Sequence, residues 1–134
     1  MDFNWLVGRH CTAVEAPTEW ATAFLFGDAC LYVETLWRVT VDDRLDLTSN
    51  DQGQSYGRGA PVDVHARATA LLVDRSITAV RADLRRGDLS IEFGSSHLLE
   101  IITDSHYEPW QLTAPGRDLV AASGGKVGNV SREV

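Results

Sequence analysis

The sequence predicts a mainly β protein, α+β at most, in which an antiparallel sheet curls on itself or forms a partly open barrel or sandwich. Most of the chain falls into short apolar or alternating segments separated by turn residues, and only one segment has helical character. The 134 residues are 44% hydrophobic, which suits a compact domain with a buried core. We therefore expect about 7–9 short strands and one helix near residues 61–73.

Up to nine segments have the β-branched, aromatic or alternating residues that are typical of strands. They are residues 10–15, 20–26, 29–35, 36–41, 76–82, 89–93, 97–102, 110–113 and 119–122. We expect Pro17 to end the first of them, and Gly27-Asp28 is a two-residue hairpin signal between the second and the third. The third and fourth segments form either two strands or one strand with a bend.

The segment between residues 42 and 75 has a different composition. Residues 42–59 are rich in Asp, Gly, Ser and Asn, which predicts a long loop. Pro61 suits the first turn of a helix, and Asp63 complements the positive end of the helix dipole. Four apolar residues share one helical face: Val64, Ala68, Leu71 and Leu72. These features favour a helix over residues 61–73, with an alternating strand as the alternative.

Composition along the chain predicts the domain boundaries and the cellular compartment. We expect one β-rich domain over residues 1–126 and a frayed tail over residues 127–134. No apolar stretch is long enough to span a bilayer, and the acidic N-terminal residues do not resemble a secretory signal. Cys11 and Cys30 lie in apolar segments, where free cysteines are common. A cytoplasmic protein is therefore expected.

The charge of the chain limits its partners. Lys and Arg number 12 against 19 Asp and Glu, which gives a net charge of −7. Nucleic acids and anionic membranes attract clustered basic residues, so both are disfavoured as partners. A basic protein would be electrostatically favoured.

Known metal and cofactor motifs are missing from the sequence. There is no Cys-x-x-Cys or paired-His spacing for zinc, no phosphate-binding loop and no Gly-x-Ser-x-Gly nucleophile motif. Asp46, Thr48 and Asn50 have the spacing of calcium ligands, but Asp51 and Gly57 stand where a calcium loop needs Gly and Glu. We therefore expect no metal, no cofactor and no catalytic residue.

Three short motifs resemble an uncharacterised family of small bacterial proteins, a domain of unknown function. They are Gly-Asp-Leu at the start of residues 87–93, Tyr-Glu-Pro-Trp at 107–110 and Gly-Gly at 124–125, with Leu-Val-Gly at 6–8 near the start. The resemblance covers residues 5–9 and 85–126, and residues 42–75 have no counterpart. It implies a single β-rich domain and brings no activity with it.

The stretch Ser-His-Tyr-Glu-Pro-Trp at residues 105–110 has two interpretations. Pro109 lacks a backbone donor, so the strand that follows is expected at a sheet edge or a bulge, with a hydrogen bond from the Trp110 indole to Glu108. In the other interpretation the stretch is the rim of a partner- or ligand-binding site. The residues of that rim would be Tyr107, Glu108, Trp110, His106, Trp37 and Arg38.

The function that we favour from the sequence is a non-enzymatic, acidic protein-binding module. It would act on a protein partner as an immunity- or inhibitor-type protein, or it would self-associate, for example as a homodimer paired through a sheet edge. The alternative is a small-ligand-binding protein or hydrolytic enzyme with a pocket near residues 106–110. In that case Glu108 or His106 would be the acid or base.

Overall fold

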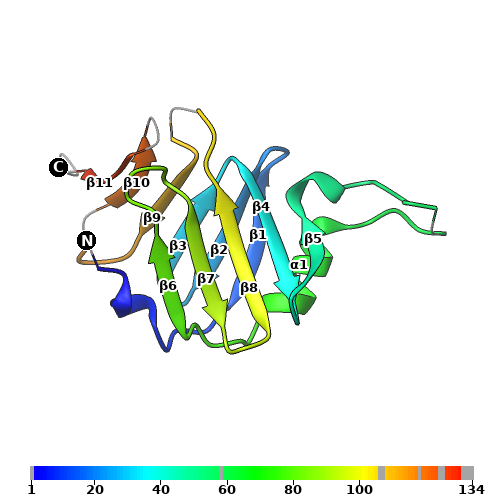
Figure 1. Ribbon diagram of the computed structural model, residues 1–134, viewed down its shortest axis with the longest axis horizontal. Coiled ribbons are helices and arrows are strands. Elements are labelled where there is room, and N and C mark those ends of the chain that lie inside the picture. Colours follow the sequence, from blue (N-terminus) through cyan, green and yellow to red (C-terminus); the bar gives the residue numbers. More distant parts are fainter. Residues whose placement is uncertain (1, 58, 106–107, 118, 124–125, 131–134) are drawn as a thin grey trace.

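Two antiparallel sheets form the layers of the molecule in the computed structural model of the chain (Figure 1). The structure describes residues 2–57, 59–105, 108–117, 119–123 and 126–130. The first sheet has the order β1-β2-β3-β9-β10-β11, and the second has the order β5-β4-β8-β7-β6. This arrangement confirms the mainly β, antiparallel fold with one helix.

The bounds of the elements follow the turn residues closely. The first sheet consists of β1 (Ala13–Thr18), β2 (Ala21–Phe26), β3 (Ala29–Val33), β9 (Trp110–Thr113), β10 (Leu119–Ser123) and β11 (Lys126–Val130). The second consists of β4 (Leu36–Val41), β5 (Arg44–Thr48), β6 (Ala79–Ala82), β7 (Leu89–Phe93) and β8 (His97–Ile102). The helical elements are η1 (Asn4–Leu6), η2 (Ser49–Asp51) and α1 (Val64–Leu72).

The core lies between the two sheets because alternate residues of the strands point inward. In β7 the residues Leu89, Ile91 and Phe93 are buried, and the residues between them are only half-buried. Phe24 of the first sheet meets Trp37 of the second edge to face, with ring centroids 5.1 Å apart. Such pairs stabilise a core by about 0.5–1.5 kcal/mol beyond the area that they bury.

The chain passes from one sheet to the other between β3 and β4. β3 pairs with β2 and β9, whereas β4 pairs with β5 and β8. Two residues, Glu34 and Thr35, connect them, and the Thr35 hydroxyl donates to the carbonyl of Ile102 at 2.7 Å. The two segments are therefore separate strands in different layers, and the alternative of one bent strand is wrong.

Helix α1 confirms the helical interpretation of residues 61–73 and closes one side of the sandwich (Figure 1). The Asp63 side chain caps its N-terminus by accepting from the Ala66 N–H at 3.1 Å. The four apolar residues predicted to share a face are buried. The helix packs against β1 and β5, which are edge strands of opposite sheets.

Part of the expected long loop over residues 42–59 is a strand. Asp42 and Asp43 adopt φ angles of 49° and 64°, and this two-residue turn brings β5 back against β4. Asp tolerates this left-handed conformation better than most residues, so the pair replaces the more common Asn-Gly. Leu47 then points into the core and is 1% exposed, and its burial fixes the strand.

Two predictions about proline were wrong. Pro17 lies inside β1, where the register shifts between Glu15 and Thr18, and an edge strand tolerates the missing donor. Pro109 does not mark an edge, because β9 is paired on both sides, with β3 and with β10. Pro109 precedes the first residue of that strand, and its carbonyl accepts from the Glu34 N–H at 2.8 Å.

The C-terminal residues that the structure describes extend the first sheet. Lys126–Val130 form β11, which pairs with β10 along its whole length. Sequence reasoning treated Gly124-Gly125 and the polar residues after them as a turn and a tail, and so missed the hairpin partner. Residues 131–134 of the expected tail lie outside the described residues.

Within the part of the chain that the structure describes, no helix combines the length and the apolar character needed to cross a membrane.

Candidate functional site

Two of the predicted site residues are core residues. Trp37 and Trp110 are 1% and 0% exposed. The Trp37 indole donates to the Thr22 hydroxyl at 3.1 Å, and the Trp110 indole donates to the Gly87 carbonyl at 2.7 Å. Buried indoles need such a partner for the N–H group. Both side chains therefore have a structural role in this molecule.

The other described members of the set lie apart from these two. Glu108 is half-buried and accepts from the Gln111 side chain at 2.5 Å, so the expected bond to the Trp110 indole is wrong. Arg38 lies on an exposed position of β4 and pairs with Glu100 of β8 at 3.1 Å. His106 and Tyr107 lie outside the described residues.

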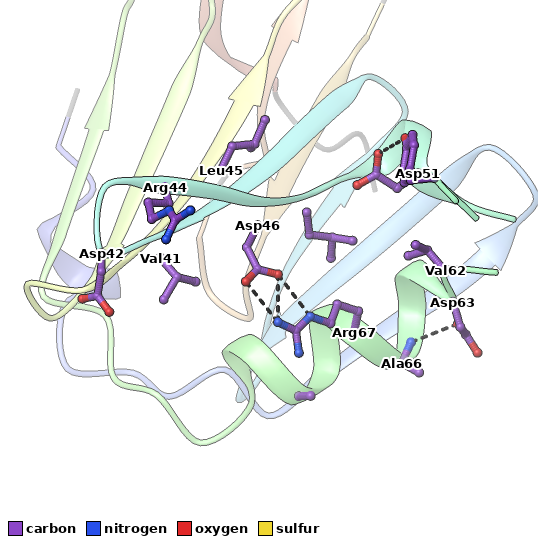
Figure 2. A pocket seen from close by; sticks show the side chains of 13 residues that line it. Val41, Asp42, Arg44, Leu45, Asp46, Asp51, Val62, Asp63, Ala66 and Arg67 are labelled. Carbon is purple, nitrogen blue, oxygen red and sulfur yellow. Dashed lines mark hydrogen bonds and ion pairs between the residues drawn. The ribbon is translucent and has the colours of Figure 1, made fainter. Parts of the chain in front are cut away.

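A groove lies between β5 and α1 (Figure 2). Its volume is about 870 Å³, within the range of about 300–1,000 Å³ that is common for binding sites. Its lining includes Asp42, Asp46, Asp51 and Asp63, with Arg44 and Arg67 as the cations. The apolar part of the lining is Val41, Leu45, Leu47, Val62, Ala66 and Ala70.

A β-bulge places Asp46 at the groove. Leu45 pairs with Thr40 and Leu47 with Val39, so Asp46 is an extra residue in β5 without a counterpart in β4. Bulges of this kind turn a side chain away from its regular direction. The Asp46 carboxylate accepts hydrogen bonds from Arg67 of α1, with N–O distances of 2.9–3.1 Å. This ion pair crosses from the strand to the helix (Figure 2).

An arm formed by residues 52–57 and 59–63 borders the groove and projects from the sandwich (Figure 1). Its base is closed by two backbone hydrogen bonds, from the Gly53 N–H to the Val62 carbonyl and from the Val62 N–H to the Gln54 carbonyl, both 2.9 Å long. The Tyr56 hydroxyl donates to Asp51 at 2.7 Å. The ring of Tyr56 is thereby fixed, although the residue is 65% exposed.

The groove is acidic at neutral pH. Burial works against ionisation of Asp51, but hydrogen bonds from the Tyr56 hydroxyl and from the Thr48 N–H and hydroxyl together lower the pKa of this carboxyl. The charge of Arg67 is balanced by Asp46, with which it forms an ion pair. Among the remaining lining residues, Arg44 is one positive charge beside the three carboxylates of Asp42, Asp51 and Asp63. The arrangement combines an excess of negative charge with an apolar lining, so it can bind a cationic group carried on an apolar chain.

A second hollow of about 360 Å³ lies on the other side of α1, where Trp37, His65 and Glu19 contribute to its walls. The His65 ring is held there by a contact between Nε2 and the carbonyl of Val14. Trp20 lies nearby at the turn between β1 and β2 and is 71% exposed, unlike the core indoles. Among the described residues, no three His, Cys, Asp or Glu side chains gather as a metal site would require.

Sequence reasoning missed this groove because it treated residues 42–59 as a loop. The available signal was the alternation of Leu45 and Leu47 with charged residues directly after Asp42-Asp43, which is a usable hairpin turn. Nothing local in the sequence indicates that Asp46 meets Arg67, because the two residues are 21 positions apart.

Comparisons with known proteins support the resemblance noted in the sequence. The model of a family of unknown function (DUF6188) matches residues 22–131. The matched range contains the motifs at Gly87 and Trp110, and it also contains residues 42–75, for which the motifs gave no counterpart. Leu6-Val7-Gly8 lies outside it. No curated protein and no solved structure matches the chain.

Proposed function

The chain belongs to the family of unknown function DUF6188, and we propose that it is a non-enzymatic binding module that takes a basic protein partner into the groove between β5 and α1. The observation that carries the proposal is the composition of that groove. It has four carboxylates and two guanidinium groups, and one of the guanidinium groups is bound to Asp46.

Charge favours a basic partner at two levels. The chain carries a net charge of −7, which attracts a basic protein over long distances and raises the rate of encounter. At the groove, Asp42 and the Asp63 carboxylate offer acceptors for Lys or Arg side chains. Asp51, which already accepts from Tyr56 and Thr48, adds negative charge. Specificity would come from the placement of these carboxylates along the groove.

The rim of the groove supplies apolar contact area. Leu45 and Tyr56 are 58% and 65% exposed. Tyrosine is enriched among the residues that dominate binding energies, and large exposed apolar side chains close to a concave site support an interface. Because the Tyr56 hydroxyl is held by Asp51, its ring loses little rotational freedom when a partner covers it.

A different protein is a better occupant than a second copy of this chain. A homodimer formed through the groove would bring two acidic sets together, and like charges across an interface cost free energy. An immunity- or inhibitor-type role fits the proposal when the partner is a basic toxin or enzyme. The proposal includes a cytoplasmic location, which the free cysteines Cys11 and Cys30 support because reducing compartments keep thiols unpaired.

The alternative site near residues 106–110 has less support. Trp110 is buried and bound to Gly87, so its indole is not accessible to a small ligand, and the half-buried Glu108 already accepts a hydrogen bond from Gln111.

The proposal is tested by capturing partners from lysate of the source organism with the tagged protein and with two charge-matched double variants. Asp42→Asn with Asp46→Asn removes two charges from the groove. Asp43→Asn with Glu92→Gln removes two charges from a separate hollow at the neighbouring turns. We expect a basic partner that is retained by the wild type and by the second variant and lost by the first. A partner that both double variants retain equally would overturn the assignment of the groove.

A further inference from the structure

We propose that the segment that occupies the groove is an extended basic peptide of the partner, which adds to β5 as a further antiparallel strand. This inference rests on the proposed function and names the form in which the partner is recognised. Its support comes from the sheet edge, the shape of the groove and the positions of its charges.

β5 is an edge strand whose only strand partner in the described chain is β4. In an antiparallel strand every second residue directs its N–H and C=O away from its neighbour, so β5 carries backbone donors and acceptors along its outer side. Arg44, Leu45 and Asp46 are exposed, which leaves this part of the edge accessible. An extended peptide can satisfy these groups by continuing the ladder.

The remaining edges are less suited to an added strand. β1 contains Pro17, which cannot donate a ladder hydrogen bond, whereas its shifted register and its contact with α1 are features that β5 shares. At the other side of the sandwich η1 packs against β6, and the Val127 N–H of β11 donates to the Leu84 carbonyl just beyond β6. β5 is the edge that has a groove of about 870 Å³ beside it.

The groove offers places for the side chains of such a strand. Successive side chains of an extended peptide point to opposite sides, so every second one would enter the space between β5 and α1. Asp42 lies at one end of the groove, and Asp51 and Asp63 lie at the other (Figure 2). Val62, Ala66 and Ala70 provide an apolar surface on the side of the arm and the helix. A segment in which Lys or Arg alternates with aliphatic residues complements both features.

Arg67 acts as an internal competitor in this arrangement. Its guanidinium occupies both oxygens of Asp46, the carboxylate nearest the middle of the groove. Removing the guanidinium frees Asp46 for a cation of the peptide, whereas removing the carboxylate takes away an acceptor. The two substitutions Arg67→Gln and Asp46→Asn therefore change the affinity for a basic peptide in opposite directions, although both break the same ion pair.

The test is a titration of the ¹⁵N-labelled protein with the peptide acetyl-Lys-Val-Lys-Val-Lys-Val-amide, followed by backbone amide shifts and hydrogen exchange. We expect shifts in β5 and α1 and slower exchange of the β5 amides that face the groove. Arg67→Gln should raise the affinity and Asp46→Asn should lower it. The same peptide methylated on all its amide nitrogens keeps its charge but cannot donate hydrogen bonds to the edge of β5. Its affinity should be at least about tenfold lower.

Each contrary outcome has its own meaning. Equal binding of the methylated peptide, with Asp46→Asn still weakening both, would overturn strand addition and leave the proposed function standing. Shifts confined to residues outside β5 and α1 would overturn strand addition, and together with a partner retained by the groove double variant they would overturn the function as well. Shifts in β5 that depend on protein concentration without peptide would assign the edge to a second copy of the chain.

Discussion

The indole N–H of Trp110 donates to the carbonyl of Gly87 at 2.7 Å. This bond joins the motif that begins at Gly87 to the motif that ends at Trp110. The Thr103 hydroxyl donates to the same carbonyl at 2.6 Å, and the Thr103 N–H donates to Asp88 at 2.8 Å. Gly87 and Asp88 of one motif and Trp110 of the other therefore meet in one hydrogen-bonded cluster, which connects the start of β7 with the start of β9 and so with the other sheet.

Removing the indole N–H should destabilise the protein. Trp110→Phe keeps an aromatic ring in the core, but it leaves a small cavity and removes the donor to the Gly87 carbonyl. The free energy of unfolding should fall by about 1–3 kcal/mol. Urea unfolding measures the difference. Trp20→Phe at the exposed turn is the control and should change the stability by about 0.5 kcal/mol or less. Equal stability of the two variants would contradict the role of this bond.

Gly87 should tolerate alanine less well than a glycine with similar backbone geometry. Its φ of 88° is in the left-handed region, and an added Cβ would lie 3.1 Å from the Thr103 side chain. Gly116 has a φ of 72° and open space around the added Cβ. Gly116→Ala therefore costs backbone strain alone, about 1–2 kcal/mol, and Gly87→Ala costs more. Thermal unfolding of the two variants compares their stabilities. An equal loss of stability would show that the Thr103 side chain can move away from the added Cβ without destabilising the fold.

The sequence was sufficient for elements whose residues define them locally. The alternating strand at residues 89–93, the strand at 97–102, the hairpin at Gly27-Asp28 and a helix near residues 61–73 were all predicted and are all present. Pro109 was misinterpreted because the rule that proline lies at edges concerns residues inside a strand, and Pro109 stands just before one. The groove could not be predicted, because it depends on contacts between β5 and α1 that are distant in sequence and on the bulge at Asp46.

The stability of the protein should decrease in mildly acidic solution through His97. This residue is 7% exposed, and burial, followed by the nearby charge of Arg75, lowers its pKa below the usual 6.5, against the opposing effect of Asp42 and Asp46. Between the two pKa values the unfolded chain binds a proton that the folded chain does not, so stability rises with pH in this window. The stabilisation that comes from His97 should be fully present above pH 6.5 and should fall as the pH drops below that value.

The measurement is the urea midpoint of the wild type and of His97→Gln at several values between about pH 8 and about pH 5. The wild type should lose more stability than the variant across this range, because carboxylates contribute equally to both. A steeper loss in His97→Gln would contradict the lowered pKa of this histidine.

The two cysteines should differ in reactivity. Cys11 is fully buried, and burial raises the pKa of its thiol to about 11, so almost no thiolate is present near pH 8. Cys30 is half-buried, and burial also raises its pKa. Maleimide labelling of the folded protein, located by mass spectrometry of peptides, should modify Cys30 slowly and Cys11 only after urea is added. Labelling of Cys11 first would contradict the packing of residues 10–15.

The ion pair between Asp46 and Arg67 should matter little for stability. Its side chains are 26% and 50% exposed, and surface pairs of this kind contribute about 0–1 kcal/mol. Asp46→Asn should therefore unfold close to the wild type in urea. This result would separate a loss of binding in the same variant from a loss of folding, whereas a large destabilisation would make Asp46 a structural residue.

The central claim is that the groove between β5 and α1 binds a basic partner, and calorimetric titration of the captured partner tests it most directly. We predict that Asp42→Asn with Asp46→Asn weakens the binding at least about tenfold, and that the wild-type affinity falls as salt rises from about 50 to about 200 mM. Asp43→Asn with Glu92→Gln should bind like the wild type. Unchanged affinity of the groove variant, or an equal loss in both double variants, would contradict the claim.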